Sequence, residues 1–479
     1  MSALRGITVV EGGIFSVILA ATLWLLAGQY YIYAAAPILV AIFLFLLSRY
    51  PVLGYALIVF MVPFDSIRGA SEEMKFLSIS KFVGIWLLLV IFTRFVVVRS
   101  GKIDVKSNLW PNLGAFFVIS LISALMSDFK MTAMDNIRQL ITAFSFYFIT
   151  LAIVTPNALS SWLPRVLIAS ITLNSLLSVI GFVFKIPFLY MDVKTMARAT
   201  GFTNDPNFFS SMVLFGLPLI AAWWLHAPTK KERFLMPVLF LVNIFAVVLS
   251  YSRAAFLVFF VMMVFLIVQY SKKLNARVVG FAVMTFILAG LIFIAVLPDK
   301  YLEHQKTVVR TEDPSIGRRA SYLYVAWDIL QKDPLLGVGP GAFRDVFAES
   351  EYALQFAQGR QDEKVLRRFA HNSYVEIVAG TGVLGLAIFL AIVFKSSSNF
   401  GAAARRLNKL NLENLASIVT AYRISQATIM IYFFFVSNVY HKYLWIPLAL
   451  SEIALRLARA QETAAGLNVP EEKNRTGGG

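Results

Sequence analysis

One histidine and a few arginines have the residue types and positions that chemistry at a membrane surface requires. His371 stands just ahead of an apolar stretch that predicts a helix, and Ser373 and Glu376 have the capping-box spacing that marks its start. An imidazole there has a pKa near neutrality and accepts a proton from a hydroxyl group. The alternative is a structural histidine that only hydrogen-bonds a neighbouring loop. His371 is the candidate catalytic residue.

Several arginines are candidate ligands for a phosphate or diphosphate group. Arg253 separates two strongly apolar runs, where a charge is costly unless it faces a partner or a cavity. Arg318 and Arg319 open an amphipathic stretch, and cations at that end of a helix suit a bound anion. Arg198 precedes an N-cap signature, and Arg138 lies at a predicted helix start. For each of them the alternative is a solvated or snorkelling charge.

The composition excludes most other kinds of site. Of 479 residues, 58% are apolar and only 15% charged, whereas a soluble domain carries about 25% charged residues, so the chain is an integral membrane protein. It has no cysteine, four scattered histidines and no Asp-x-Asp pair, which predicts neither a cofactor nor a metal site. The glycine-rich stretch 335–343 lacks the Gly-Lys-Ser/Thr ending of a nucleotide-binding loop.

Apolar runs long enough to cross a bilayer as helices recur along the whole chain. They predict an all-α fold, a polytopic transmembrane helical bundle of about 12–14 spans with one large, partly helical periplasmic loop. The predicted spans are 7–27, 30–48, 52–65, 78–98, 109–127, 137–155, 162–184, 207–226, 234–250, 254–271, 278–297, 373–395, 415–437 and 443–457. No stretch shows the alternating polarity that is typical of a strand.

Basic residues in the short loops predict the orientation, because cytoplasmic loops collect Lys and Arg. The stretches 99–106, 230–233, 272–277 and 395–409 carry net charges of +2, +2, +3 and +4, so we expect them in the cytoplasm with both termini. The segment 298–370 holds eleven basic and eleven acidic residues and is expected in the periplasm. The net charge of +16 is therefore mainly a topology signal, and no nucleic-acid partner is expected. The candidate site residues all fall on the periplasmic side.

This orientation divides the chain into four parts. They are transmembrane helices 1–11 with short loops in 1–297, a periplasmic loop domain in 298–371, C-terminal transmembrane helices in 372–460 and a disordered cytoplasmic tail in 461–479. In the loop domain, residues 318–332 predict an amphipathic helix that Pro334 ends. In the helix that follows, Gly380, Gly382 and Gly385 predict close helix packing.

Arginines and a histidine on one membrane surface describe a site for a lipid-linked phosphate or diphosphate with a proton acceptor nearby. Three stretches in this region resemble the O-antigen ligase and O-antigen polymerase superfamily of bacterial envelope glycosyltransferases. They are Ser252-Arg253, the run 333–343, and His371-Asn372-Ser373-Tyr374-x-Glu376 followed by Gly380-Thr381-Gly382-Val383-Leu384-Gly385. The likeness covers residues 201–394.

The resemblance implies a polytopic inner-membrane enzyme that joins a glycan from undecaprenyl diphosphate to an acceptor hydroxyl on the periplasmic face. Its expected partners are the undecaprenyl-diphosphate-linked glycan donor, a glycan or lipid A-core acceptor, and the lipid bilayer. By position, His371 matches the essential histidine of the family. Arg253, and either Arg318 or Arg319, match the arginines associated with the diphosphate.

Three functions remain open at this point. The leading hypothesis is a ligase that transfers a glycan to lipid A-core or a similar acceptor, without a metal and with inversion at the sugar C1. The first alternative is a polymerase that acts on two lipid-linked glycans. The second is a transporter of an anionic lipid or glycolipid, although the chain shows no matching pair of broken helices in inverted repeats.

Overall fold

The computed structural model describes most of the chain. The described residues are 16, 20–24, 27–28, 33, 35–64, 78–94, 104–186, 189–193, 196–203, 205–226, 229–270, 280, 287, 291, 314–357, 366–439 and 442–466. Most of the spans expected at 7–27 and 278–297, and most of the tail expected at 461–479, lie outside them. The last described helix, α20, extends to Ala464.

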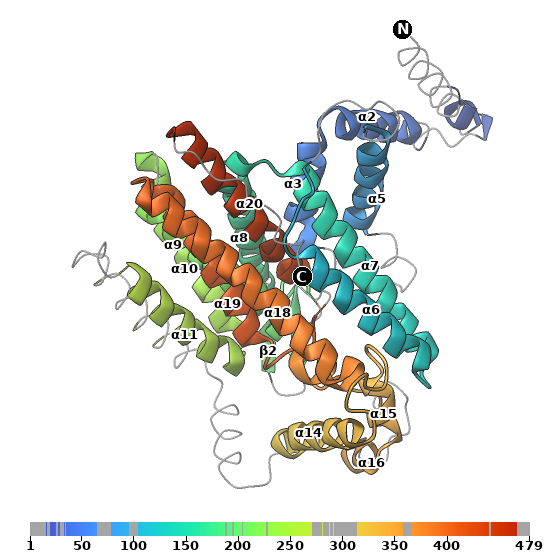
Figure 1. The fold of residues 1–479 in the computed structure, drawn as a ribbon. Helices are drawn as coiled ribbons and strands as arrows, with labels where there is room; N and C mark the ends of the chain where they lie inside the picture. Colours follow the sequence, from blue (N-terminus) through green and yellow to red (C-terminus); the bar gives the residue numbers. More distant parts are fainter. Residues whose placement is uncertain are drawn as a thin grey trace, which may run out of the picture.

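Long apolar helices run back and forth between two ends of a bundle (Figure 1). They are α6 (Trp110–Met126), α7 (Lys130–Ile153), α8 (Trp162–Val183), α9 (Pro206–Leu225), α10 (Lys230–Leu249), α11 (Arg253–Tyr270), α18 (Ser373–Lys409), α19 (Glu413–Tyr432) and α20 (Lys442–Ala464). In the described part, six helices are long and apolar enough to cross a membrane, or up to seven if one bent pair is a single span. The polytopic all-α fold is confirmed, and the count of about 12–14 spans stays a prediction.

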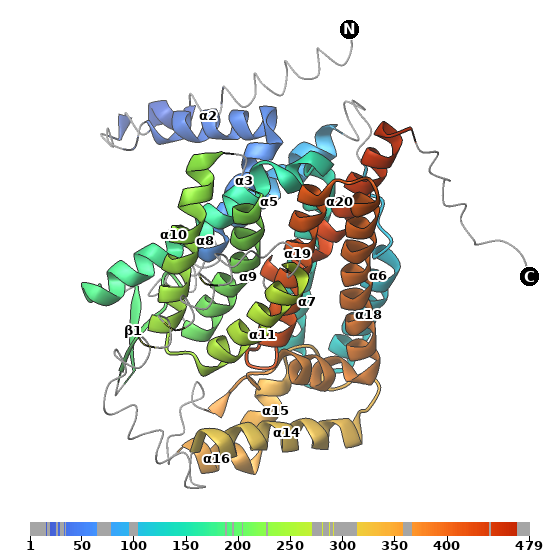
Figure 2. The same cartoon turned by 90° about the vertical axis from the view of Figure 1, so that its left-hand side faces the viewer.

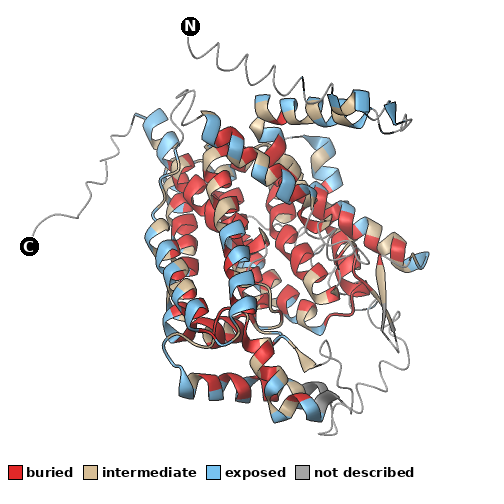
Figure 3. Ribbon diagram, turned by 90° about the vertical axis from the view of Figure 1, so that its right-hand side faces the viewer, coloured by how far each residue is buried: buried red, intermediate tan, exposed pale blue. Residues whose placement is uncertain are grey.

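Buried residues lie on the inside of the bundle, and exposed residues lie on its outside (Figure 3). Trp445, Tyr147 and Phe116 are buried, whereas Val268 and Phe394 are exposed on the outer surfaces of α11 and α18. Helices that are apolar on all sides suit a lipid environment, because the hydrocarbon chains cover the outward face.

The N-terminal part differs from the two crossings that we predicted at 30–48 and 52–65. Helix α2 (Ala36–Arg49) and α3 (Pro51–Met61), which the short helix η2 (Val62–Phe64) continues, are bent by 109° at Tyr50. Tyr50 leaves the helical region because the ring of Pro51 disfavours helical backbone in the residue before it. As a result α2 lies across the end of the bundle, while α3 and α5 (Ile79–Phe92) run into it (Figure 2).

The two ends of the bundle have different structures. At one end lie α14 (Pro314–Lys332), α15 (Phe343–Glu349) and α16 (Glu351–Ala357), the core of the predicted loop domain (Figure 2). At the other end, ion pairs join Arg165 to Glu232 and Arg406 to Glu462, at 3.2 and 3.4 Å. The basic stretches 230–233 and 395–409 thus reach the end opposite the loop domain. Which end faces the cytoplasm stays a prediction.

A small hairpin departs from the expectation that the chain has no strands. Strand β1 (Tyr190–Val193) pairs antiparallel with β2 (Met196–Ala199), and Met191 stands opposite Arg198. Each strand has only four residues, which is too short for a clear alternation of polar and apolar residues. The sequence therefore did not predict these strands. The hairpin places Arg198 beside the α10–α11 turn.

The loop domain has its own small core. Tyr322 on α14 contacts Phe343 and Phe347 on α15, with ring centroids 6.1 and 4.8 Å apart. Helix α14 begins at Pro314, four residues earlier than predicted, because proline suits the first turn of a helix. It ends at Lys332, just ahead of Pro334, as predicted.

Helix α18 is broken near its start, where we predicted one continuous helix. Gly382 has φ 67° and ψ −173°, a conformation that only glycine adopts without strain. The glycine-rich turn satisfies the backbone at the break, because Val338 and Gly339 donate amide hydrogen bonds of 2.9 and 3.0 Å to the carbonyls of Ala379 and Gly380. Gly382 therefore provides the break rather than a contact between two helices.

Candidate functional site

His371 lies immediately before α18, as predicted, and in an unusual backbone conformation. Its φ is 51°, the left-handed region that non-glycine residues seldom occupy. Asn372 is the N-cap of α18, and its side chain accepts amide hydrogen bonds from Tyr374 and Val375 at 3.0 and 3.2 Å. The capped helix start thus fixes the chain directly after the histidine.

The predicted capping box of Ser373 and Glu376 is wrong, because both side chains have other partners. Ser373 donates its hydroxyl to the carbonyl of Val436 at 2.6 Å. Glu376 accepts a 2.7 Å hydrogen bond from the amide of Ala370. The two side chains connect the start of α18 to neighbouring loops, and the N-cap lies one residue earlier than expected.

Charged groups from three separate segments act on His371. They are Arg319 and Arg318 on α14, Arg368 in the preceding loop, and Asp205 at the start of α9. The surrounding protein lowers the pKa of the imidazole below its usual value, Asp205 raises it, and the three arginines lower it further. His371 is therefore neutral over a wider pH range than a free histidine, the form that accepts a proton.

Tyr322 links α14 to the histidine. Its ring centroid lies 6.4 Å from that of His371, and its side chain is buried. Burial raises the pKa of the Tyr322 hydroxyl, while Arg318, Arg368 and Arg319 oppose the shift, with Arg368 also hydrogen-bonded to it. Arg318 and Arg319 therefore lie on the helix whose Tyr322 packs beside His371.

Arg198 supports the turn that carries Arg253. Its Nε donates a 2.8 Å hydrogen bond to the carbonyl of Ser250, and one terminal nitrogen donates at 3.3 Å to the carbonyl of Tyr251. Tyr251 has φ 49°, the left-handed backbone of a tight turn. The two hydrogen bonds from the Arg198 guanidinium stabilise this turn. Arg253 begins α11 directly after the turn, with its side chain exposed.

Ser252 connects this turn to two other helices. Its hydroxyl donates to Oδ1 of Asn207 at 2.7 Å, lies 3.0 Å from the Tyr432 hydroxyl, and accepts a 3.1 Å hydrogen bond from the amide of Ala255. Asp205 caps α9 beside it and accepts from the Asn207 amide at 2.7 Å, as the N-cap signature predicted. The start of α9, the start of α11 and the end of α19 therefore form one polar unit.

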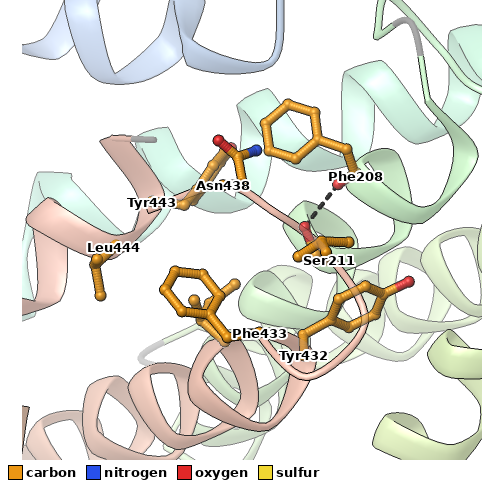
Figure 4. Close-up of a pocket in the computed structure, with 9 residues that line it drawn as sticks. Phe208, Ser211, Tyr432, Phe433, Asn438, Tyr443 and Leu444 are labelled. Atoms are coloured by element: carbon orange, nitrogen blue, oxygen red, sulfur yellow. Dashed lines mark hydrogen bonds between the residues drawn. The ribbon is translucent and has the colours of Figure 1, made fainter. Parts of the chain in front are cut away.

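A small pocket lies next to this unit, between α9, the end of α19 and the loop that leads to α20 (Figure 4). Phe208, Ser211, Phe433 and Asn438 are among its lining residues, together with Tyr432. The loop 433–438 also contacts the His371 segment, because Phe433 accepts a 2.8 Å hydrogen bond from the Ser373 amide.

Arg138 lies apart from these contacts. Helix α7 begins at Lys130 rather than at the predicted 135–138, so Arg138 is beyond its second turn. The guanidinium is exposed and pairs with Asp135 on the same helix at 3.4 Å. Within the described part of the chain, Arg138 is not among the charged groups that act on His371.

Sequence reasoning missed several residues of this neighbourhood. The sequence predicts only that Tyr322 belongs to the amphipathic helix of residues 318–332 and that Asp205 belongs to the N-cap signature after Arg198, and it indicates no role for Arg368. Arg368 stands three residues before His371, and Tyr322 follows Arg318 by one helical turn, which are the signals that the sequence offers. In the described residues, no three His, Asp or Glu side chains gather as a metal site.

Fold and site together define a polytopic α-helical membrane protein that holds a histidine and several arginines at one end of its bundle. Comparison with protein families then identifies the relevant group: residues 238–390 match the model of the O-antigen ligase family. This confirms the resemblance to the O-antigen ligase and polymerase superfamily. The matched residues, less than half of the chain, include Arg253, Arg318, Arg319 and His371. No curated protein matches the chain.

Proposed function

We propose that this protein is a membrane glycosyltransferase that moves a glycan from undecaprenyl diphosphate to a hydroxyl group of an acceptor such as lipid A-core. One observation carries the proposal. His371, whose pKa the surrounding protein lowers, lies beside Tyr322 of α14, the helix that carries Arg318 and Arg319, at the end of the bundle where Arg253 also begins its helix. A proton acceptor beside several guanidinium groups suits transfer from a diphosphate leaving group.

The proposed reaction forms a bond between the acceptor oxygen and the sugar C1 while the bond from C1 to the diphosphate oxygen breaks. His371 takes the proton of the acceptor hydroxyl. Arg253, with Arg318 or Arg319, stabilises the negative charge that grows on the departing undecaprenyl diphosphate. Attack from the face opposite the leaving group inverts C1, and no metal takes part.

Arg198 and Arg138 have different places in this proposal. Arg198 acts on the diphosphate through the turn that it holds, because its guanidinium donates to two backbone carbonyls of that turn. Arg138 is exposed at the same end of the bundle, where it attracts the anionic donor from a distance.

The proposal includes a location for the enzyme. It is a multi-pass protein of the bacterial inner membrane, with the loop domain of residues 298–371 in the periplasm and both termini in the cytoplasm. The basic ends of α10 and α18, on the side opposite the loop domain, support this orientation. Labelling of single cysteines placed in the otherwise cysteine-free chain tests it, with one position in α16 and one near Lys409.

The test of function is the mass of the product formed from a defined lipid-linked glycan by purified protein in lipid nanodiscs. His371→Ala should reduce transfer about 100- to 10,000-fold. Arg253→Ala should reduce it about 100- to 1,000-fold. His226→Ala and Arg165→Ala, at the opposite end of the bundle, are matched controls that should retain activity.

Two further experiments test whether a metal takes part and distinguish a ligase from a polymerase. A chelator should leave the rate unchanged, since the proposed chemistry needs no metal. Donor alone should give no product with a ligase, whereas longer lipid-linked chains in that sample identify a polymerase. Full transfer by His371→Ala contradicts the proposed mechanism.

A further inference from the structure

Glu376 is a buried residue whose carboxylate contacts both segments next to His371. Its Oε1 accepts a 2.7 Å hydrogen bond from the amide of Ala370 and a 3.1 Å hydrogen bond from the hydroxyl of Ser437. Ala370 directly precedes His371, and Ser437 belongs to the loop between α19 and α20. One oxygen atom thus ties the histidine segment to the loop that borders the pocket.

His371 needs such support because of its backbone. A φ of 51° is unfavourable for a residue with a side chain and persists only where neighbouring contacts enforce it. After the histidine, Asn372 caps α18 and Ser373 binds the carbonyl of Val436. On the N-terminal side of the histidine, the hydrogen bond from the Ala370 amide to Glu376 restrains the backbone in the same way.

The position of Glu376 separates this role from direct chemistry. Its carboxylate is buried in the first turn of α18, where it holds the Ala370 amide. The charged groups that act on the imidazole come instead from Asp205, Arg318, Arg319 and Arg368. Glu376 therefore acts on the histidine through the backbone.

We propose that Glu376 is a positioning residue, whose hydrogen bonds to Ala370 and Ser437 hold His371 in the backbone conformation that presents its imidazole to the acceptor hydroxyl. This inference rests on the proposed function. Its energetic basis is the sensitivity of transfer reactions to geometry, since a displacement of about 1 Å costs about 100-fold in rate.

The experiment compares kcat and the donor KM of nanodisc-embedded variants with a lipid-linked glycan donor. Glu376→Ala should lower kcat about 10- to 100-fold and leave the donor KM within about 2-fold, because positioning of the base affects the chemical step. Glu376→Gln should recover most of the rate, since its amide oxygen still accepts from Ala370. Ser425→Ala is the matched control: it loses a buried 2.7 Å hydrogen bond to the Phe215 carbonyl elsewhere in the bundle and should keep the wild-type kcat.

Several results would overturn the proposal. A wild-type kcat in Glu376→Ala shows that the contact is dispensable, and a Glu376→Gln variant as slow as Glu376→Ala shows that the carboxyl group itself takes part in chemistry. If Glu376→Ala does not accumulate, Ser437→Ala decides, with a moderately lowered kcat supporting the proposal and an unchanged kcat refuting it. A wild-type protein that transfers nothing refutes the proposed function, a result distinct from activity that survives in Glu376→Ala.

Discussion

The amide of Val338 donates a 2.9 Å hydrogen bond to the carbonyl of Ala379 and thereby joins the glycine-rich turn to the break in α18. The next residue along each segment repeats the contact, since Gly339 donates to Gly380 at 3.0 Å. Two motifs that lie some forty residues apart in the sequence are thus one structural element. This element fixes the first turns of α18, which carry Glu376 and begin just after His371.

Gly382→Ala should lower the free energy of unfolding by about 1–3 kcal/mol. The φ of 67° is unfavourable for alanine, and an added Cβ would collide with the backbone of Leu335. Thermal unfolding of the detergent-solubilised protein measures the change. Gly114→Ala is the control, because a Cβ there meets open space and alanine favours a helix, so equal losses in both variants would contradict the explanation.

The rate of transfer should fall on the acid side with an apparent pKa below 6.5, the ordinary value for histidine. Burial lowers the pKa of His371, so the neutral form that accepts a proton persists to lower pH, and activity is lost only when the imidazole protonates. The pH profile of kcat/KM for the acceptor measures this value. An acid limb above 6.5 would be inconsistent with His371 as the base in this environment.

Two substitutions near His371 should move that acid limb in opposite directions. Arg368→Gln removes a positive charge that lowers the pKa of His371, so the limb should shift to higher pH. Asp205→Asn removes a negative charge that raises the pKa, so the limb should shift to lower pH, while asparagine still caps α9. Shifts of the same sign would show that structural changes, rather than charge, dominate.

Ser252→Ala should destabilise the protein by about 0.5–2 kcal/mol and lower its activity, because the hydroxyl caps α11 and binds Asn207. Loss of the cap releases the helix start at which Arg253 stands. Unfolding temperature and transfer rate are measured on the same sample. Ser425→Ala, which also loses one buried hydrogen bond, should be destabilised by a similar amount with normal transfer.

The sequence alone predicted the helices and most of the motif positions. Apolar length identified α8, α9 and α11 to within a residue or two, because each crosses the bundle as one uninterrupted run. The N-cap at Asp205, the end of α14 before Pro334 and the place of His371 outside α18 follow from local rules. The break at Tyr50 follows locally from Pro51, but its angle of 109° and the early start of α7 at Lys130 do not, since they depend on packing at the ends of the bundle.

The neighbourhood of His371 was decided by the tertiary structure. Asp205, Tyr322 and Arg368 come from three segments, and no spacing in the sequence predicts that they meet. The break at Gly382 and the bonds of Glu376 likewise depend on partners far along the chain, at 334–339 and at Ser437. Local sequence determines which backbone conformations are low in free energy. Long-range hydrogen bonds and packing stabilise the unfavourable ones, such as the left-handed backbone of His371.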